Sequence, residues 1–430
     1  IDLHWMVHVQ GALELADRLR LLLPEQRIVF GGLSASRYAR ELIRAPAVDM
    51  ALRGYDTHEP LGQLLEAERS GQGLERVPNL LWKDRAGRVH DNGLTHLPRE
   101  LSSGVDWSVQ GAASPSRGLP IRELMSVQAA GCTFDCPWCG GSRSAFQRIH
   151  GCDHALAPKS LDAVEAELSS IPPLPSAAQL HLYTAGSYND SEVRLRAFLD
   201  RVERSNARSI SIEQFHLPSA EIVEQMARAC RTTITLSPQS PDLRVAKLAG
   251  RGVYTPEQME VWIERALDRG IHRIEVWYFV GMPEQDEREV LATVEQCRHL
   301  LARFGGRQLV PMICPMIPFL DPGSALFEDP EPHGYRLFFR TLEEHRRGMT
   351  RASLVNRLNY ETRWLSRTDL IRVGYRAAAA VLEARAEAGA VPRSTARRYL
   401  EAIDDALAFL PRVTAADDLG DGLERARALE

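Results

Sequence analysis

The sequence predicts an α/β protein in which a partial (β/α)6 barrel follows the second half of an open, Rossmann-like α/β domain and precedes a helical C-terminal region. Two series of alternating strand and helix signals predict the two α/β parts, and the loss of strand signals after residue 334 predicts the helical part. The length of 430 residues, with 44% apolar and 25% charged residues, is typical of a globular chain of two to three domains.

Residues 1–93 carry the first series. Its strand signals end in glycine, at Gly31-Gly32 and at Gly54, as in a parallel sheet that binds ligands at the carboxyl ends of its strands. Because the chain opens at Ile1 inside this series, we expect a fragment that lacks the first strands of the domain. The expected elements are a helix over residues 10–23, a strand over 27–30, a helix near 38–44 and a strand over 50–53.

Residues 94–121 are rich in Ser, Gly, Ala and Pro, and we interpret them as a linker. The second series then occupies residues 122–334, and its six units, where a full barrel has eight, predict a partial barrel with its chemistry at the carboxyl ends of the strands. The expected strands cover residues 122–129, 178–184, 209–215, 232–237, 273–280 and 308–314. The expected helices cover residues 160–171, 191–205, 219–230, 256–269 and 286–303, the fourth of them opened by a Thr255 cap, Pro256 and Gln258.

The C-terminal part, residues 335–413, is predicted to be helical and to cap the barrel. Its two clearest helices are an Ala-rich segment over residues 376–388 and a second segment near 394–410. Residues 414–430 are acidic, and we expect them to form a frayed tail.

Charge and composition narrow the possible partners. A formal net charge of -5 and a pI of about 6.3 provide no basic field for nucleic acid or anionic lipid. No apolar run reaches the roughly 18 residues of a transmembrane helix. We therefore expect a cytoplasmic protein that binds neither nucleic acid nor a membrane. Seven cysteines, of which three are clustered, predict a reducing compartment and one metal site.

Cys132, Cys136 and Cys139 form that cluster, directly after the first expected barrel strand. Three thiolates on one short loop suit a soft-metal site, and a 4Fe–4S cluster held by three cysteines keeps one iron open. A structural zinc closed by Cys152 and His154 is an alternative, although it leaves Cys132 as a surplus thiol. Three ordinary buried cysteines are a further alternative.

The three-then-two spacing of these cysteines, with Trp138 directly before the third, resembles the signature of the radical S-adenosylmethionine (SAM) superfamily. The resemblance implies that Cys132, Cys136 and Cys139 hold a 4Fe–4S cluster whose open iron is chelated by the amine and carboxylate of SAM. One electron would cleave the sulfonium to give a 5′-deoxyadenosyl radical, while the protein orients the cofactor and excludes water and oxygen.

Other barrel segments support the resemblance. Residues 276–284 resemble the fifth-strand segment along the SAM adenine, and residues 236–240 resemble the fourth-strand end. The second strand end, residues 183–187, departs from the Gly-Gly-Glu-like element usual in the superfamily. Ordinary barrel packing is the alternative for each side chain. The resemblance implies a SAM site that includes Trp138, Thr184, Gly186, Ser237, Gln239, Val280 and Gly281.

Residues 4–8, 29–36 and 48–60 resemble the later strands of the cobalamin-binding domain that precedes the barrel in cobalamin-dependent radical SAM enzymes. Residues 77–92 resemble the small connecting hairpin of those enzymes. Gly31-Gly32 would let the backbone approach a large flat ligand because no Cβ intervenes. Asp2-Leu3-His4 is not the cobalt-ligating Asp-x-His-x-x-Gly motif, since position 7 is Val. The expected cobalamin contacts are His4, Gly31, Gly32, Ser34, Gly54, Tyr55 and Glu59.

Together these resemblances imply a class B-like, cobalamin-dependent radical SAM methyltransferase that methylates an unactivated carbon or phosphorus centre. Its cofactors would be a 4Fe–4S cluster, SAM and cobalamin, and its partners a small-molecule or natural-product substrate and an electron donor such as flavodoxin or ferredoxin. Alternatives are a cobalamin-dependent cyclase or ring-contraction enzyme, a radical SAM enzyme with a degenerate N-terminal scaffold, and a zinc- or cluster-stabilised sensory or binding module. The sequence identifies no catalytic residue.

Overall fold

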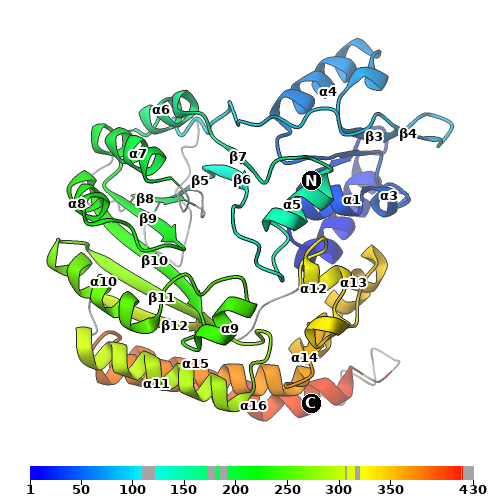
Figure 1. Cartoon of the computed structure of the whole chain (residues 1–430). Coiled ribbons are helices and arrows are strands. Elements are labelled where there is room, and N and C mark those ends of the chain that lie inside the picture. The colour runs from blue at the N-terminus through cyan, green and yellow to red at the C-terminus, as the bar shows by residue number, and fades with distance from the viewer. Residues whose placement is uncertain are drawn as a thin grey trace.

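The computed structural model describes residues 1–108, 122–172, 180–184, 191–305, 308–314, 320–417 and 419. Figure 1 shows an arc of strands with helices on its outer side, an N-terminal lobe beside α5, and long C-terminal helices along one end of the arc. None of the helices within these ranges combines the length and the apolar character needed to cross a bilayer.

The N-terminal lobe is built on a small mixed sheet in the order β1-β2-β3-β4. Strands β1 and β2 are parallel, and the β3–β4 hairpin adds to β2 in antiparallel fashion, which confirms the hairpin expected over residues 77–92. The elements are η1 (Met6–His8), α1 (Val9–Leu22), β1 (Val29–Phe30), α2 (Leu33–Arg37), α3 (Ala39–Leu42), β2 (Met50–Leu52), α4 (His58–Ser70), η2 (Leu74–Arg76), β3 (Leu80–Lys83) and β4 (Val89–Asp91).

The second sheet has six parallel strands in the order β12-β11-β10-β9-β8-β5. Among the described residues its first and last strands, β12 and β5, do not pair with each other, so the partial barrel predicted from six units is confirmed. The strands are β5 (Arg122–Ser126), β8 (Leu180–Thr184), β9 (Ser209–Gln214), β10 (Arg231–Gln239), β11 (Arg273–Phe279) and β12 (Leu309–Cys314). The helices between and beside them are α5 (Arg143–His150), α6 (Leu161–Ser169), α7 (Glu192–Arg204), α8 (Ala220–Ala229), α9 (Leu243–Leu248), α10 (Pro256–Asp268) and α11 (Glu287–Phe304).

Side-chain alternation separates the two faces of this sheet. In β11, the fully buried Ile274, Val276 and Tyr278 alternate with half-buried residues such as Glu275 and Trp277. The buried set packs with the apolar sides of the surrounding helices in one large core. The other face is more polar and lines the inside of the partial barrel. The capping box predicted at Thr255 is present and begins α10.

The predicted linker is partly a packed segment. Leu101 pairs with Lys159 in an isolated parallel bridge, and Trp107, only 7% exposed, enters the barrel core while its backbone N–H donates to Ser170 Oγ at 2.8 Å. Residues 94–108 therefore run along α6, because apolar anchors hold them there. Residues 109–121 lie outside the described ranges.

The C-terminal region corrects two expectations. It contains a short antiparallel strand pair, β13 (Tyr335–Leu337) with β14 (Tyr360–Thr362), where only helices were expected. The last helix continues past residue 413 through Ala416, because Asp417 accepts the backbone N–H groups of Ala352 and Ser353 and fixes that helix end. The helices are α12 (Ala325–Glu328), η3 (Glu331–His333), α13 (Leu342–Met349), α14 (Leu354–Arg357), α15 (Arg367–Glu387) and α16 (Arg393–Ala416).

Candidate active site at the cysteine loop

The three clustered cysteines occupy a loop between β6 (Ala129–Gly131) and α5, and β6 pairs with β7 (Leu156–Pro158) in antiparallel fashion. Gly131 begins the loop with a φ of 81°, and a Cβ there would meet the ring of Phe146 at 3.1 Å. Cys132 N donates to Ala155 O at 3.0 Å. Glycine is therefore required where the chain turns out of β6 into the loop.

Hydrogen bonds within the loop fold it tightly. Cys139 N donates to Cys136 O at 3.1 Å, and Ser142 N donates to Cys139 O at 3.2 Å. The Asp135 carboxylate accepts both the backbone N–H and the hydroxyl of Ser144, at 3.0 and 2.7 Å, and so ties the loop to the first turn of α5. All three cysteines are free thiols, and their charges act on one another: Cys132 and Cys136 both contribute to raising the pKa of Cys139.

Arg251 is the cation at this loop. Its Nη1 donates to Cys136 Sγ at 2.7 Å, and its guanidinium lies 3.5 Å from the ring centroid of Phe215. Cys136 is 4% exposed, and burial raises the pKa of its thiol to about 11, while the Arg251 charge acts in the opposite direction. The preceding residue, Gly250, has a φ of 84°, and a Cβ there would lie 2.6 Å from Cys136 Cα. Backbone contact at Gly250 thus places the guanidinium against the thiol.

Polar groups from two strand ends lie near Arg251. Ser237 Oγ, near the end of β10, donates to Glu213 Oε1 at 2.8 Å on the neighbouring strand β9. Burial raises the pKa of Glu213, and the hydrogen bond from Ser237 and the charge of Arg251 act against that rise. Gln239, buried and in the left-handed region with a φ of 71°, interacts with the Cys136 thiol. The barrel therefore presents both a cation and a carboxylate beside the thiols.

The far side of the loop rests on the segment before α12. The Asp321 carboxylate accepts the Gly140 N–H at 2.9 Å, and Asp321 N donates to Trp138 O at 3.1 Å. Burial raises the pKa of Asp321 to about 6. Burial and the Asp321 charge both raise the pKa of Cys139. The indole of Trp138 lies 5.9 Å from the ring of Phe279 at the end of β11, which places it at the mouth of the barrel.

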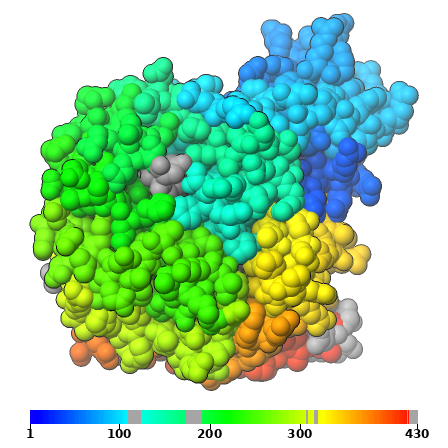
Figure 2. Space-filling model, in the orientation of Figure 1, coloured from blue at the N-terminus to red at the C-terminus, as the bar shows by residue number. Residues whose placement is uncertain are grey.

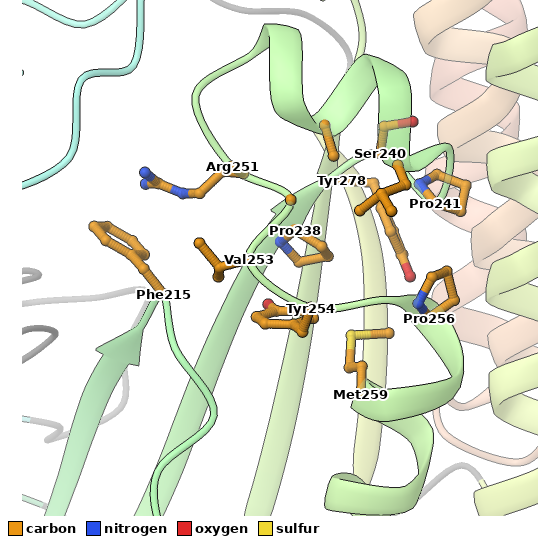
Figure 3. A pocket seen from close by; sticks show the side chains of 13 residues that line it. Phe215, Pro238, Ser240, Pro241, Arg251, Val253, Tyr254, Pro256, Met259 and Tyr278 are labelled. Carbon is orange, nitrogen blue, oxygen red and sulfur yellow. The ribbon is translucent and has the colours of Figure 1, made fainter.

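A small, mainly apolar cavity lies on the other side of Arg251, between the ends of β10 and β11 and the start of α10 (Figure 3). The Tyr278 hydroxyl points into it among Pro256 and Met259 and, within the described part of the chain, has no hydrogen-bond partner. The residues around it are Phe215, Pro238, Ser240, Pro241, Leu243, Ala246, Arg251, Gly252, Val253, Tyr254, Pro256, Met259 and Tyr278.

The structure gathers several of the predicted SAM contacts and separates others. Trp138, Ser237 and Gln239 surround the cysteine loop. Val280 and Gly281 follow β11, but there the C-terminal region packs closely: Tyr335 OH donates to Gly281 O at 2.7 Å. Thr184 ends β8, and nothing is described of its side chain; Gly186 lies outside the described residues.

The predicted cobalamin contacts occupy the carboxyl edge of the N-terminal sheet, but their roles differ. Gly32, with a φ of 105°, faces Leu3, since a Cβ there would lie 2.8 Å from the Leu3 carbonyl; the space is filled by the chain itself. At Gly54, also at 105°, the Asn79 amide fills the equivalent space. Glycine at these two positions is therefore required by the fold itself, because a Cβ would meet neighbouring residues; contact of this edge with cobalamin stays a prediction.

The other predicted cobalamin contacts are either exposed or in contact with neighbouring parts of the protein. His4 and Glu59 are exposed, and Glu59 lies 3.7 Å from the His96 ring. Ser34 Oγ donates to His4 O at 2.8 Å, and a Cβ at Gly31 would meet Leu52 O at 3.7 Å. His4 and Glu59 are thus the members of this set whose side chains are exposed.

Tyr55 joins the N-terminal lobe to α5. Its ring lies 4.7 Å from that of Phe146, and its hydroxyl lies 2.7 Å from both Pro98 O and His154 Nε2. Cys152 Sγ donates to the backbone O of His154 at 3.3 Å. The two residues expected to close a zinc site thus belong to this contact with Tyr55. Among the described side chains, no three His, Cys, Asp or Glu groups are arranged to hold a single metal ion.

Sequence reasoning missed Arg251, Glu213 and Asp321 as site residues. Arg251 carried one usable signal, because Gly250 and Gly252 flank it in a barrel loop and glycine pairs mark tight turns. Glu213 and Asp321 carry no local signal that distinguishes them from surface carboxylates. They become visible only when the strands bring them beside the cysteines.

Comparison with known proteins identifies the class. Residues 127–297 match the family model described as the Radical SAM superfamily. This part of the chain is a radical SAM domain, a fold that implies a 4Fe–4S cluster and SAM. The three thiols on one loop, with a cation and a carboxylate beside them, fit both groups. A search of curated protein sequences found no match.

Solved structures share the fold. Among them is the radical S-adenosylmethionine methyltransferase TsrM from Kitasatospora setae with cobalamin and a 4Fe–4S cluster bound, with 18% identity, a TM-score of 0.54, and coverage of 77% of this chain and 66% of that one. Another is the cobalamin-dependent S-adenosylmethionine radical enzyme OxsB with aqua-cobalamin and SAM bound, with 13% identity, a TM-score of 0.56, and coverage of 99% and 65%. The chain thus spans about two thirds of the length of each.

Proposed function

We propose that this protein is a cobalamin-dependent radical SAM enzyme that transfers a methyl group to an unactivated carbon or phosphorus centre of a small molecule or natural product. The observation that carries the radical SAM part is the convergence of Cys132, Cys136 and Cys139 on one loop, with Arg251 against the second thiol. When bound there, a 4Fe–4S cluster supplies the electron that cleaves SAM reductively.

The chain's own residues have distinct tasks in this proposal. The three thiolates hold the cluster and leave one iron for SAM. Arg251 provides a guanidinium for the SAM carboxylate, and the Glu213 carboxylate accepts hydrogen bonds from an amine or ribose hydroxyl. Gln239 and Ser237 orient these groups from β10. Trp138 and Phe279 cover the loop at the barrel mouth and limit the access of water.

The cobalamin part is supported by the arrangement of the two lobes. Tyr55 anchors the carboxyl edge of the N-terminal sheet on α5, the helix that follows the cysteine loop. A ligand at that edge would therefore lie next to the cysteine domain, with exposed His4 and Glu59 at its rim. OxsB with aqua-cobalamin shares the fold over 99% of this chain. These rim residues fit a large polar cofactor, whereas Gly32 and Gly54 shape the backbone beneath it.

Methyl transfer is supported by the methyltransferase TsrM, which shares the fold and whose structure has also been described with a tryptophan substrate and a SAM analogue, at 16% identity and a TM-score of 0.50. A cyclisation or ring-contraction enzyme is the alternative within the same class, and its product would carry no methyl from SAM.

The cluster is tested with cysteine variants. Anaerobically reconstituted protein should contain about four irons per chain. Cys132→Ala, Cys136→Ala and Cys139→Ala should each lose most of that iron, and Cys152→Ala should keep it as the matched control. One zinc per chain that is lost with Cys152→Ala and kept with Cys132→Ala would contradict the proposal and favour the zinc site.

The reaction class is tested by its products. A methylase should consume two SAM molecules per turnover and release both S-adenosylhomocysteine and 5′-deoxyadenosine, because one SAM donates the methyl group and the other the radical fragment. Methyl-deuterated SAM and candidate metabolites, analysed by mass spectrometry, should give a labelled product. An unlabelled, rearranged product with 5′-deoxyadenosine would replace methyl transfer by cyclisation or ring contraction. Absence of both nucleosides from fully reconstituted protein would favour a binding module.

A further inference from the structure

The C-terminal region holds a surface hollow whose charge differs from that of the chain as a whole. The hollow encloses about 340 Å³, within the range of ligand and contact sites on proteins. Three of its lining residues, Arg347, Arg351 and Arg367, are arginines and one, Glu344, is acidic. We call it the arginine hollow; it is lined by Phe338, Phe339, Glu344, Arg347, Gly348, Arg351, Asn356 and Arg367.

The positive charge around the arginine hollow is concentrated and partly balanced, since Glu343 pairs with both Arg346 and Arg347 and Arg351 donates to the Asp417 backbone carbonyl. Residues 336–367 contain eight arginines and three glutamates, in a chain whose net charge is -5. The Glu344 carboxylate is engaged by the start of α13, since it accepts the N–H groups of Arg340 and Thr341 at 2.8 and 2.9 Å. The Phe338 ring holds Arg367 at 3.7 Å and Arg336 at 5.0 Å from its centroid. Such a surface attracts acidic partners.

The arginine hollow lies behind the cysteine loop, with α12 between them. On one side, Leu326 N donates to Pro137 O of the loop at 2.9 Å. On the other side, the Phe327 ring stacks with His345 at 6.0 Å, and His345 lies 5.8 Å from Phe339, a lining residue of the hollow. One helix and one layer of aromatic side chains thus separate the loop from the hollow. Figure 2 shows residues of α12 and α13 (yellow) at the surface, against the segment of the cysteine loop and α5 (cyan).

We propose that the arginine hollow is the docking surface for an acidic one-electron carrier protein that reduces the cluster. This inference rests on the proposed function, because only a redox site behind α12 needs such a carrier. The barrel mouth faces SAM and substrate, so electrons reach the cysteine loop most directly from its α12 side. One electron leaves the reduced carrier, which is thereby oxidised, and enters the cluster; no bond forms or breaks in this step. Complementary charge would steer the encounter and make it sensitive to salt.

A charge-reversal pair tests the proposal. The variant Arg347→Glu/Arg367→Glu reverses two charges of the arginine hollow. The control Arg397→Glu/Arg398→Glu makes the same charge change on exposed residues of α16, about 30 Å along that helix from Asp417, whose backbone carbonyl accepts from Arg351 of the hollow. Formation of 5′-deoxyadenosine is measured with reduced flavodoxin, an acidic carrier, and separately with dithionite.

In the hollow variant the rate of 5′-deoxyadenosine formation with flavodoxin should fall at least roughly tenfold. The rate with dithionite and the iron content should be unchanged. The control should behave as wild type with both reductants, and added salt should slow only the flavodoxin reaction. Equal flavodoxin-driven rates in variant and wild type would overturn the proposal, as would an equal loss with both reductants.

Docking is also measured without the cluster, so that its failure and the failure of the proposed function remain distinct. Binding of flavodoxin to cluster-free wild-type protein should be weakened at least about tenfold by the hollow variant and should be unaffected by the control. Inactivity of the wild type with dithionite would count against the proposed function. Failure of flavodoxin to bind the cluster-free wild type would overturn the docking site alone. So would a hollow variant that no longer binds a small phosphate ester but binds flavodoxin as the wild type does.

Discussion

The guanidinium of Arg251 donates a hydrogen bond through Nη1 to the Sγ of Cys136, at 2.7 Å, across 115 positions of the sequence. The two residues are held together by backbone contact, because Gly250 lies against Cys136 and Phe215 stacks under the guanidinium. A fixed cation thus meets the thiol that burial otherwise keeps protonated. The contact links the cysteine loop to the β10–α10 connection and leaves a cation fixed on that side of the loop.

Arg251→Gln should weaken SAM binding with little loss of iron. The three thiols remain, so the cluster should assemble, but a charge-assisted hydrogen bond of about 1.5–3 kcal/mol to the SAM carboxylate is removed, which corresponds to roughly 10–100-fold in Kd. Equilibrium dialysis with labelled SAM on reconstituted protein measures the change. Arg228→Gln, on the exposed side of α8, is the control. A variant that holds no iron would instead assign Arg251 to stabilising the Cys136 thiolate.

Gly250→Ala should disrupt the cysteine loop. The new Cβ would lie 2.6 Å from Cys136 Cα, where backbone has to move, and the φ of 84° is costly for any residue with a side chain. We expect most of the iron content to be lost. Gly151→Ala is a close control, since Gly151 also has a positive φ, of 65°, yet a Cβ there meets nothing within 4 Å. Iron analysis of both reconstituted variants decides; equal iron in the two would show that the loop tolerates the displacement.

The periodic parts of the fold could be predicted from sequence. The six parallel strands and the helix begun by Thr255 follow from alternation of apolar residues and from local capping chemistry, which depend on neighbours along the chain. The cysteine loop could be found for the same reason, since its three thiols lie within one short segment. Patterns among residues close together in the sequence were therefore sufficient to predict the class of protein.

Features that depend on distant partners could not be predicted. The strand Tyr335–Leu337 forms because Tyr360–Thr362 pairs with it, and the end of α16 is fixed because Asp417 accepts the N–H groups of Ala352 and Ser353. The close contact of Gly32 with the backbone of Leu3 is likewise invisible in the local sequence. In each case the deciding contact lies tens of residues away along the chain.

Tyr55→Phe should loosen the contact between the N-terminal lobe and α5. It removes the hydroxyl that lies 2.7 Å from both Pro98 O and His154 Nε2 and keeps the ring against Phe146. Leaving those half-buried groups unpaired should lower stability by about 1–3 kcal/mol. Thermal unfolding of the cluster-free protein, followed by circular dichroism, measures the loss. An unchanged midpoint would mean that water replaces the hydroxyl without cost.

His150 should make the stability of this same contact dependent on pH. The side chain is 2% exposed, lies among the rings of Phe146 and Tyr55, and has a pKa lowered by burial to about 4. An unfolded histidine titrates near 6.5. Because the folded pKa is the lower one, the unfolded state takes up the proton first as the pH falls. The stabilising effect of a neutral His150 is therefore complete above about pH 6.5 and is lost as the pH approaches 4.

The loss should reach about 3 kcal/mol over that interval, from a separation of some 2.5 pKa units. His150→Phe keeps an aromatic ring and cannot be protonated, and the Nδ1 of His150 has no partner to lose among the described residues. Its unfolding free energy should therefore fall less steeply than that of the wild type between pH 6.5 and 4, with little difference at pH 7.5. His333→Gln, an exposed histidine in η3, should follow the wild-type curve. Parallel curves for wild type and His150→Phe would show that His150 is protonated in the folded protein, which is incompatible with its apolar, ring-lined environment.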